Sequence, residues 1–394
     1  MNTNYVVTAD SITGPWSDPI DLNIGNIDPG HVTDKAGNRY LYFSSGSYVL
    51  LSDDGLSVTG ELVHAYDGWP IPRDWTIECF CLEGPKLVKR GEYVYLTVAE
   101  GGTSGPPTGH MVISARSRSP LGPWENSPYN PIIRTRNRFE QWGSVGHGTI
   151  FKDIDENWWM IFHGYENGYY NMGRQTLLTP VEWTEDDWYK IPDDIQIDQP
   201  IRRPAGQASN AAFSLSDDFA GNTLKPHWKF FGEYNTDRFQ LTDPGLMITG
   251  KGRSIGDSSP LLCVPSHHSY MAQVELQIKG NAVGGLILFY NNDACSGILA
   301  DANNILADLR GWQFPTEENV IENHAYLRLI NRNHIVDMYY SVDGDTWIKI
   351  QNSLEVSGFH HNVLSGFLSL RIGLCSIGNG QVVFRNFEYT PLRM

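Results

Sequence analysis

The chain has 394 residues, more than one hydrophobic core usually serves, so we expect two domains of about 100 to 200 residues each. Its 45 acidic and 29 basic side chains give a net charge of −16, which argues against nucleic acid and against anionic membranes as partners. Aromatic residues make up 12% and charged residues 19%, a composition that excludes disorder and coiled coils and is typical of β-sheets.

The first residues, MNTNYVVTADSITGPW, lack the basic and apolar blocks of a signal peptide, and no apolar run approaches the length of about eighteen residues that would span a membrane. The five cysteines form an odd set without a CxxC or Cys/His spacing, which predicts neither a disulfide framework nor a zinc site. We therefore expect a cytoplasmic protein in a reducing compartment.

Short apolar runs rich in Val, Ile, Tyr, Phe and Trp alternate with turn residues along the whole chain, and helical periodicity is almost absent. The sequence therefore predicts an all-β protein. From the N-terminus, three segments share the order strand, tight turn, aromatic strand, and their aromatic strands begin near Tyr40, Tyr93 and Trp158. Units of this length built from about four short strands are typical of propeller blades. Unrelated meandering hairpins are the alternative.

A second sequence motif also repeats, at positions offset from those of the first repeat. Residues 6–20 resemble residues 112–128, because each segment has a strand, a short loop and then Gly-Pro-Trp, which predicts equivalent places for Trp16 and Trp124. Residues 1–200 thus hold three complete copies and the outer strands of one more at the N-terminus. Closing a propeller takes at least about four blades, so we expect an N-terminally incomplete propeller with an open sheet edge.

The segment of residues 192–212 is rich in Pro, Ala and Gly and shows little of the alternation of apolar and polar residues that marks a strand. Such a composition is typical of an interdomain connection. We place the boundary near residue 205 and predict domains at 1–205 and 206–394. Alternating strands recur throughout the second domain, and Asp343-Gly344 predicts a hairpin. A two-sheet β-sandwich is expected, and the jelly-roll variant cannot be told from other sandwiches by pattern.

Two acids stand at matching places in successive repeats. Asp28 precedes Pro29, and Glu83 precedes Gly84-Pro85. Equivalent positions of successive blades face the central axis, so both acids are expected to converge on one pocket. Singly, each motif would be read as an ordinary turn, but their recurrence in phase with the blades favours the shared pocket.

The third repeat carries His147 between two glycines at the matching place, where an imidazole could bind a hydroxyl or ligate a cation. Arg174 follows an aromatic loop and begins a strand, so its guanidinium could donate to sugar hydroxyls or lower the pKa of a neighbouring acid. A satisfied core histidine and an arginine paired on the rim are the structural alternatives.

These residues lie in segments that resemble glycoside hydrolase family 43, the β-xylosidases and α-L-arabinofuranosidases. The segments are DPGHVTDKAGNRYLYFSSG, ECFCLEGPKLVKRGEYVYLTVAEGG, ARSRSPLGPWENSPYNPII, SVGHGTIF and MGRQTLLTPVEWT. The resemblance spans the first 192 residues in order, and residues 213–390 resemble the β-sandwich that follows the propeller in the xylosidase-type members.

The resemblance implies a five-bladed propeller that hydrolyses xylo-oligosaccharides or arabinofuranosyl side chains with inversion. It implies Glu83 as the general acid and Asp28 as the acid that tunes its pKa. It implies Arg174 as a sugar ligand beyond the scissile bond and His147 as the axial histidine, which often lies near calcium. No cofactor is expected to be required, and Ca²⁺ is compatible with the site.

Aromatic residues near the expected pocket offer platforms for stacking a pentose ring, with ordinary packing as the alternative. They are Trp69, Trp75, Phe80 and Trp142. A sandwich loop at residues 312–314, Trp-Gln-Phe, is the segment that we would first test for a contribution to the pocket.

The family's general base, an Asp in an Asp-Pro context on the first blade, has no match in residues 1–394. By the repeat phase, Asp10 and Asp18 lie in an outer strand and a loop, so neither is placed to replace it. Two alternatives to hydrolysis therefore stay open. The chain could only bind sugar, or it could be a subunit that another chain completes, with oligomers formed through the open propeller edge.

Overall fold

The computed structural model describes residues 3–207, 214–232, 236–243, 245–316 and 320–393. The chain forms two compact units. Unit 1 contains Met1–Asn167 and Arg174–Ala208, and unit 2 contains Gly168–Gly173 and Ser209–Met394. The all-β prediction is confirmed, because the helical elements of the described chain are one short α-helix, α1 (His361–Leu364), and three 3₁₀ turns at Ser44–Gly46, Tyr170–Met172 and Thr236–Arg238. Among the described residues, no helix has the length and apolar character needed to cross a membrane.

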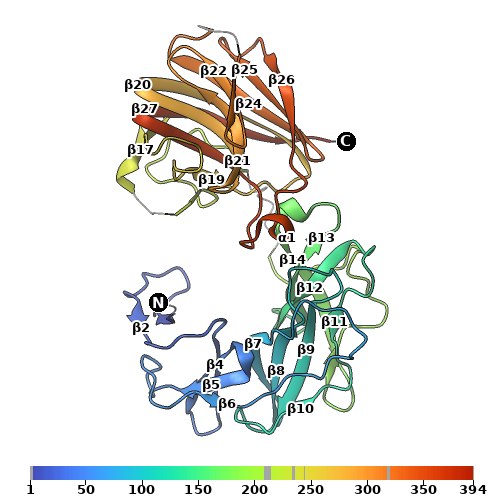
Figure 1. The fold of residues 1–394 in the computed structure, drawn as a ribbon. Coiled ribbons are helices and arrows are strands. Elements are labelled where there is room, and N and C mark those ends of the chain that lie inside the picture. The colour runs from blue at the N-terminus through green and yellow to red at the C-terminus, as the bar shows by residue number, and fades with distance from the viewer. Residues whose placement is uncertain (1–2, 208–213, 233–235, 244, 317–319, 394) are drawn as a thin grey trace. The chain divides into compact units, whose positions relative to one another are not determined.

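Unit 1 is built from antiparallel sheets that follow one another around an arc (Figure 1). The first sheet has two strands, β1 (Tyr5–Val6) and β2 (Ile20–Asp21). The second contains β3 (Gly30–Thr33), β4 (Arg39–Phe43), β5 (Ser47–Leu50) and β6 (Val63–His64). The third contains β7 (Glu83–Arg90), β8 (Tyr93–Glu100), β9 (Met111–Ser117), β10 (Glu125–Asn126) and β11 (Ile133–Arg134). The fourth contains β12 (Trp142–Lys152), β13 (Trp158–Glu166), β14 (Arg174–Trp183) and β15 (Tyr189–Lys190).

This arrangement has three complete blades and one outer strand pair, as the repeats predict. The aromatic strands are the second strands of their sheets, and they are largely buried; Tyr42 and Tyr95 are 0% exposed. The equivalence of the Gly-Pro-Trp segments also appears in the backbone, since Gly14 and Gly122 have φ angles of +82° and +85°. Each of these glycines lies against the indole two residues later, Trp16 or Trp124.

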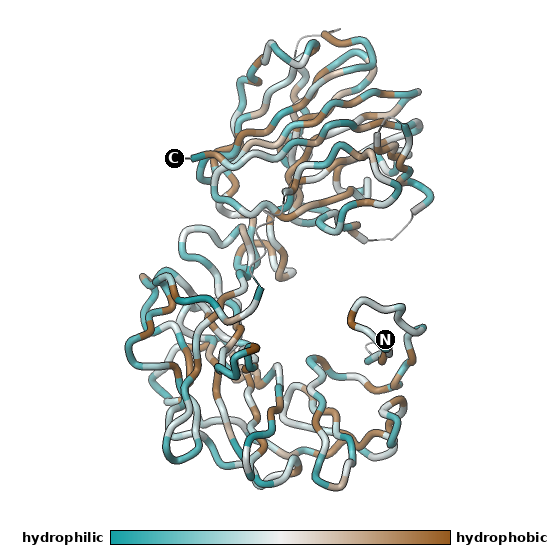
Figure 2. The backbone as a smooth tube through the Cα atoms, turned by 180° about the vertical axis from the view of Figure 1, so that it is seen from behind, coloured by the Kyte–Doolittle hydropathy of each residue, from teal (hydrophilic) through white to brown (hydrophobic). Residues whose placement is uncertain are grey.

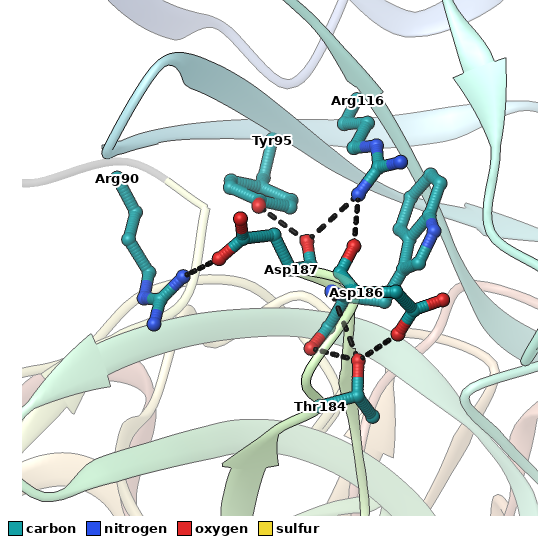
Figure 3. Close-up of polar contacts among 7 residues, drawn as sticks. Arg90, Tyr95, Arg116, Thr184, Asp186 and Asp187 are labelled. Atoms are coloured by element: carbon teal, nitrogen blue, oxygen red, sulfur yellow. Dashed lines mark hydrogen bonds and ion pairs between the residues drawn. The ribbon is translucent and has the colours of Figure 1, made fainter.

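The third and fourth sheets are tied together through the turn between β14 and β15 (Figure 3). Arg90 donates to the Asp187 carboxylate at 2.7 Å, and Arg116 donates to the backbone oxygens of Asp186 and Asp187 at 2.7 and 3.1 Å. The Tyr95 hydroxyl donates to the same Asp187 oxygen. These contacts fix the strand pairs that carry Glu83 and His147 relative to one another.

Unit 2 is a sandwich organised around two long strands, β20 (Ser269–Asn291) and β27 (Arg371–Pro391), which pair along most of their length. The first half of β20 also pairs with β24 and its second half with β21. The remaining strands are β16 (Lys229–Phe230), β17 (Phe239–Thr242), β18 (Gly245–Thr249), β19 (Leu261–Cys263), β21 (Ala294–Ala300), β22 (Ile305–Leu309), β23 (Trp312–Pro315), β24 (His324–Arg332), β25 (Ile335–Ser341) and β26 (Ile348–Glu355).

Hydropathy changes at short intervals along the strands of unit 2 (Figure 2), and alternate residues of β24 are buried in a single large core. The predicted hairpin at Asp343-Gly344 is confirmed, because it joins the antiparallel strands β25 and β26. The Trp-Gln-Phe segment expected as a loop is instead the edge strand β23, and all four of its residues are exposed.

The single predicted boundary near residue 205 does not account for Gly168–Gly173, which precedes it and belongs to unit 2. Within unit 2 the ring of Tyr169 stacks on His268 with centroids 3.6 Å apart, and the carbonyl oxygen of Gly168 lies 2.7 Å from Nε2 of His334. Contacts between residues so distant in sequence leave no local signal, so the sequence pattern could not reveal them.

Gly30, the first residue of β3, allows close approach of β3 and β7. A Cβ at this position would lie 2.0 Å from the carbonyl oxygen of Pro85 in β7. Gly30→Ala is therefore expected to destabilise the protein by about 1 to 3 kcal/mol, the usual cost of overpacking. Thermal unfolding followed by circular dichroism measures this. Gly358→Ala is the control, since a Cβ there meets nothing within 4 Å, and an equal melting temperature for both variants would contradict the prediction.

Candidate active site

Asp28 lies two residues before the start of β3 and is held by groups from two neighbouring sheets. Its backbone has a φ of +59°, a conformation that only a few residue types adopt readily. Its Oδ2 accepts hydrogen bonds from the Ser44 hydroxyl at 2.9 Å and from the backbone N–H of Gly84 at 3.1 Å. The carboxylate therefore has a fixed orientation toward the start of the next sheet.

Glu83 is the first residue of β7 and is half-buried. A register shift between Glu83 and Lys86 and the φ of +64° at Gly84 bend the strand where the acid leaves it. Burial raises the pKa of Glu83, and the nearby charge of Asp28 raises it further, while Arg174 opposes the shift. The geometry thus favours a carboxyl group that keeps its proton to higher pH than an exposed glutamate.

His147 reaches the same point from β12. Two register shifts flank Gly146, and His147 itself has a φ of +55°, so the strand bulges where the imidazole leaves it. A Cβ on Gly84 would lie 2.4 Å from Nε2 of His147, which shows how closely the ring approaches β7. Ligand atoms of Asp28, Glu83 and His147 all lie within 4.8 Å of one another. Burial lowers the pKa of His147, so the ring is neutral at neutral pH.

A cavity of about 490 Å³ opens beside Glu83. It is lined by Ile27 and Ser44 from the region of Asp28, by His64, Tyr66 and Asp67 from the segment after β5, and by Phe80 and Leu82 from the approach to β7. Phe80 is 43% exposed and therefore offers ring surface to a ligand. The size and the largely apolar lining suit a small ligand held by a few polar groups.

The other predicted site residues divide into two groups. Arg174, the first residue of β14, is exposed, and its charge acts on Glu83 and His147, so it lies near both. Trp75 is not among the residues that line the cavity beside Glu83. It lines a separate cavity of about 930 Å³ together with Trp142, and its ring is covered by the guanidinium of Arg134 at 3.5 Å.

Several side chains near the site carry no sequence signal of their own. Ser44 orients Asp28, and the charge of Glu78 adds to the rise in the pKa of Glu83. His110 and His163 stack with ring centroids 5.1 Å apart, and both rings are largely buried. These contacts join residues that are distant in sequence, so the sequence pattern could not reveal them.

Among the residues that the structure describes, two sets of side chains could hold a metal ion: Asp28, Glu83 and His147, and the three histidines 110, 147 and 163. Calcium prefers six to eight oxygen ligands, whereas three imidazoles suit zinc and similar ions. In the first set, Asp28 already accepts two hydrogen bonds and burial favours the protonated form of Glu83. The donors therefore match calcium poorly.

The structure also contains a disulfide that the sequence did not predict. Cys79 and Cys81 are bonded to each other on either side of Phe80, while Cys263, Cys295 and Cys375 are free and buried. A Cys-x-Cys spacing is not a recognised signature of pairing, so the cysteine count alone could not reveal it. The bond closes a small ring in the segment that leads to Glu83.

Among the described residues, the structure does not assign a counterpart of the missing general base. Asp10 and Asp18 are both exposed on the connection between β1 and β2. Asp10 lies outside the short strand β1 (Tyr5–Val6), in which the repeat phase had placed it. Both positions are consistent with the expectation that neither carboxylate serves the site.

Comparisons with known proteins bear on this arrangement. Residues 1–189 match the family described as Glycosyl hydrolases family 43, and residues 216–390 match the β-xylosidase C-terminal concanavalin A-like domain. A non-reducing end α-L-arabinofuranosidase of Bacteroides ovatus is 30% identical over 96% of this chain and 73% of its own length. A xylan 1,3-β-xylosidase of a Vibrio species is 32% identical over 89% of this chain and 72% of its own length.

The fold has counterparts among solved structures. A family 43 protein of Bacillus licheniformis, with 23% sequence identity, superposes with a TM-score of 0.87 over 99% of this chain and 80% of its own. This likeness confirms the propeller and sandwich architecture. Together with the two relatives of at least 30% identity and the matched family segments, it shows that the chain belongs to glycosyl hydrolase family 43.

Proposed function

We propose that the protein is an inverting glycoside hydrolase that releases xylose from xylo-oligosaccharides or arabinose from arabinofuranosyl side chains. The observation that supports this most strongly is the close approach of the Asp28 and Glu83 carboxyl groups, within 4.8 Å, at the edge of the cavity that Glu83 lines, with the pKa of Glu83 raised. Two relatives described as an arabinofuranosidase and a xylosidase support the same substrate class. The choice between the two pentosides is left to the assay.

In the proposed reaction, Glu83 donates its proton to the glycosidic oxygen as the bond from that oxygen to the anomeric carbon breaks. A water molecule forms the new bond to the anomeric carbon on the opposite face of the sugar and gives up one proton, which passes to solvent because no described residue is assigned as the base. Burial and, after it, the negative charge of Asp28 raise the pKa of Glu83 and so help it to keep its proton. Arg174 and the neutral ring of His147 would donate to sugar oxygens, and Phe80 would stack on the ring.

The spacing of the two acids supports these roles. The acid and base of an inverting glycosidase stand about 6.5 to 9.5 Å apart, which leaves room for the attacking water. Ligand atoms of Asp28 and Glu83 lie within 4.8 Å, so Asp28 is too close to serve as that base. A nucleophilic role for Asp28 would make the enzyme retaining, and proton NMR of the first-formed sugar anomer distinguishes these outcomes.

The assay is the release of nitrophenol from nitrophenyl β-D-xyloside and α-L-arabinofuranoside. We expect turnover of at least one of them and inversion at the anomeric carbon. Retention would overturn the roles given to the two acids. No turnover, together with heat of binding for xylobiose in calorimetry, would instead support a chain that binds sugar and lacks its general base.

A chain completed by another copy or by a second protein is the remaining alternative, because no described residue is assigned as the base. Gel filtration combined with the assay tests it. Activity confined to an oligomeric fraction would favour completion by a second chain, whereas an active monomer would exclude it.

Removal of metal ions is expected to leave pentoside hydrolysis within the same order of magnitude. The reason is that the proposed proton transfer uses a protein carboxyl group, and the donors near His147 match calcium poorly. The measurement is the turnover rate after dialysis against EDTA, with metal content checked by mass spectrometry. Activity that disappears and returns only with added Ca²⁺ would refute this expectation.

A further inference from the structure

Glu100, the last residue of β8, is a fully buried carboxyl group that the proposed reaction does not use. Its Oε1 accepts a hydrogen bond from the backbone N–H of Trp69 at 2.7 Å. Its Oε2 is buried without a hydrogen-bond partner among the described residues. Burying a carboxyl group with so few partners is costly, so the position calls for a reason beyond filling space.

The side chain of Glu100 contacts residues 68–69, and the backbone of the next residue in the chain holds a second segment, residues 78–80. Gly68 has a φ of +85°, and a Cβ there would lie 2.4 Å from Oε1 of Glu100 and 2.6 Å from the Phe80 ring. The next residue of the chain, Gly101, donates its N–H to the carbonyl oxygen of Phe80 at 2.9 Å and accepts from the N–H of Glu78 at 3.0 Å. The end of β8 therefore anchors residues 66–69 and residues 78–80 together.

These two segments, which we call the pocket wall, line the cavity beside Glu83. Tyr66 and Asp67 contribute from the first segment and Phe80 from the second. We propose that Glu100 is a positioning residue, which holds the pocket wall in the geometry that receives the sugar next to Glu83. The expected effect on sugar binding rests on the proposed function. The contacts between Glu100 and its neighbours do not depend on that function.

The charge state of Glu100 decides whether the pocket wall is stable. Burial raises the pKa of Glu100 to about 8, against the opposing effect of the Trp69 hydrogen bond, so the group is uncharged at neutral pH. The titratable groups that face it are Tyr66, whose pKa the Glu100 charge raises, and His110, whose ring interacts with the Glu100 backbone carbonyl. Burial lowers the pKa of His110 well below its usual value, so that ring is neutral too. In the described chain, no basic side chain contributes to the shift at Glu100.

Below about pH 8 the neutral acid fits the buried site, and above it the carboxylate lacks a counter-ion there, which favours separation of the pocket wall from β8. Sugar affinity is therefore expected to fall as the pH rises through this value.

The test measures xylobiose binding by calorimetry between about pH 6 and 10, with Glu83→Gln as the background so that titration of the catalytic acid does not interfere. We expect Kd to be constant at low pH and to rise about tenfold per pH unit above the pKa of Glu100. Adding Glu100→Gln, which keeps the acceptor for Trp69 and cannot ionise, should preserve the neutral-pH affinity and remove the rise. Adding Glu100→Ala should weaken binding at every pH. An unchanged alkaline rise in the Glu100→Gln variant would overturn the proposal.

A measurement without sugar separates this proposal from the proposed function. The tryptophan fluorescence of the otherwise unmodified protein should change with a midpoint near pH 8, and this change should be absent in Glu100→Gln and reduced in Trp69→Phe. Glu61→Gln, at an exposed position, should leave it intact. If no variant binds xylobiose but the transition depends on Glu100, the proposed function fails and the anchoring of the pocket wall stands. If sugar binds but the transition is insensitive to Glu100→Gln, the positioning role fails.

Discussion

Replacement of Glu83 by glutamine is expected to lower the hydrolysis of xylobiose by about 10²- to 10⁴-fold, the usual contribution of a general acid. Glutamine keeps the size of the side chain but cannot protonate the leaving oxygen. The loss should be smaller for nitrophenyl pentosides, because nitrophenolate leaves with little help from a proton donor. Steady-state rates on both substrates measure the difference.

Glu61→Gln provides the matched control, since it makes the same chemical change at an exposed position of unit 1. Its rates should equal those of the unmodified protein. Xylobiose binding should survive in the Glu83 variant, because the cavity and its other lining groups remain. Hydrolysis of xylobiose that is unaffected by Glu83→Gln would remove this residue from its proposed role.

Replacement of Asp28 by asparagine is expected to change both the rate and its pH dependence. The negative charge of Asp28 raises the pKa of Glu83, so its removal lowers that pKa and the alkaline limb of the profile of kcat/KM moves to lower pH. The hydrogen bonds from Ser44 and Gly84 to Oδ2 also change. A catalytic group misplaced by about 1 Å can cost about 10²-fold, and we expect a rate loss of that order.

The profile of kcat/KM from about pH 4 to 9 provides the measurement, with Asp18→Asn as the control because it removes one negative charge from an exposed loop. The control should match the unmodified protein. An alkaline limb that stays in place in Asp28→Asn would show that Asp28 does not tune Glu83, whatever the change in rate.

The blades and the sandwich were predictable because their signals are local. The aromatic strands that begin near Tyr40, Tyr93 and Trp158 repeat within short windows, and each forms the second strand of a blade. Asp343-Gly344 specifies its hairpin in two residues. The loop Gly168–Gly173 was missed because its place in unit 2 depends on contacts with His268 and His334.

The candidate site shows the same division. Asp28, Glu83 and His147 could be found because they recur in phase with the blades, and the structure brings their ligand atoms within 4.8 Å. Trp75 was placed near the sugar only as an aromatic residue in the right region, and the irregular segment before β7 carries it to another cavity. Glu100 gave no signal, because a glutamate at the end of a strand is usually exposed and its burial follows from the packing of distant segments.

The most direct test of the account is a crystal structure of the Glu83→Gln variant with xylobiose. We expect sugar in the cavity lined by Phe80 and Tyr66, with the glycosidic oxygen within hydrogen-bonding distance of the residue 83 side chain and Asp28 beside it. Sugar bound elsewhere, or Asp28 and residue 83 turned away from a shared ligand, would contradict it.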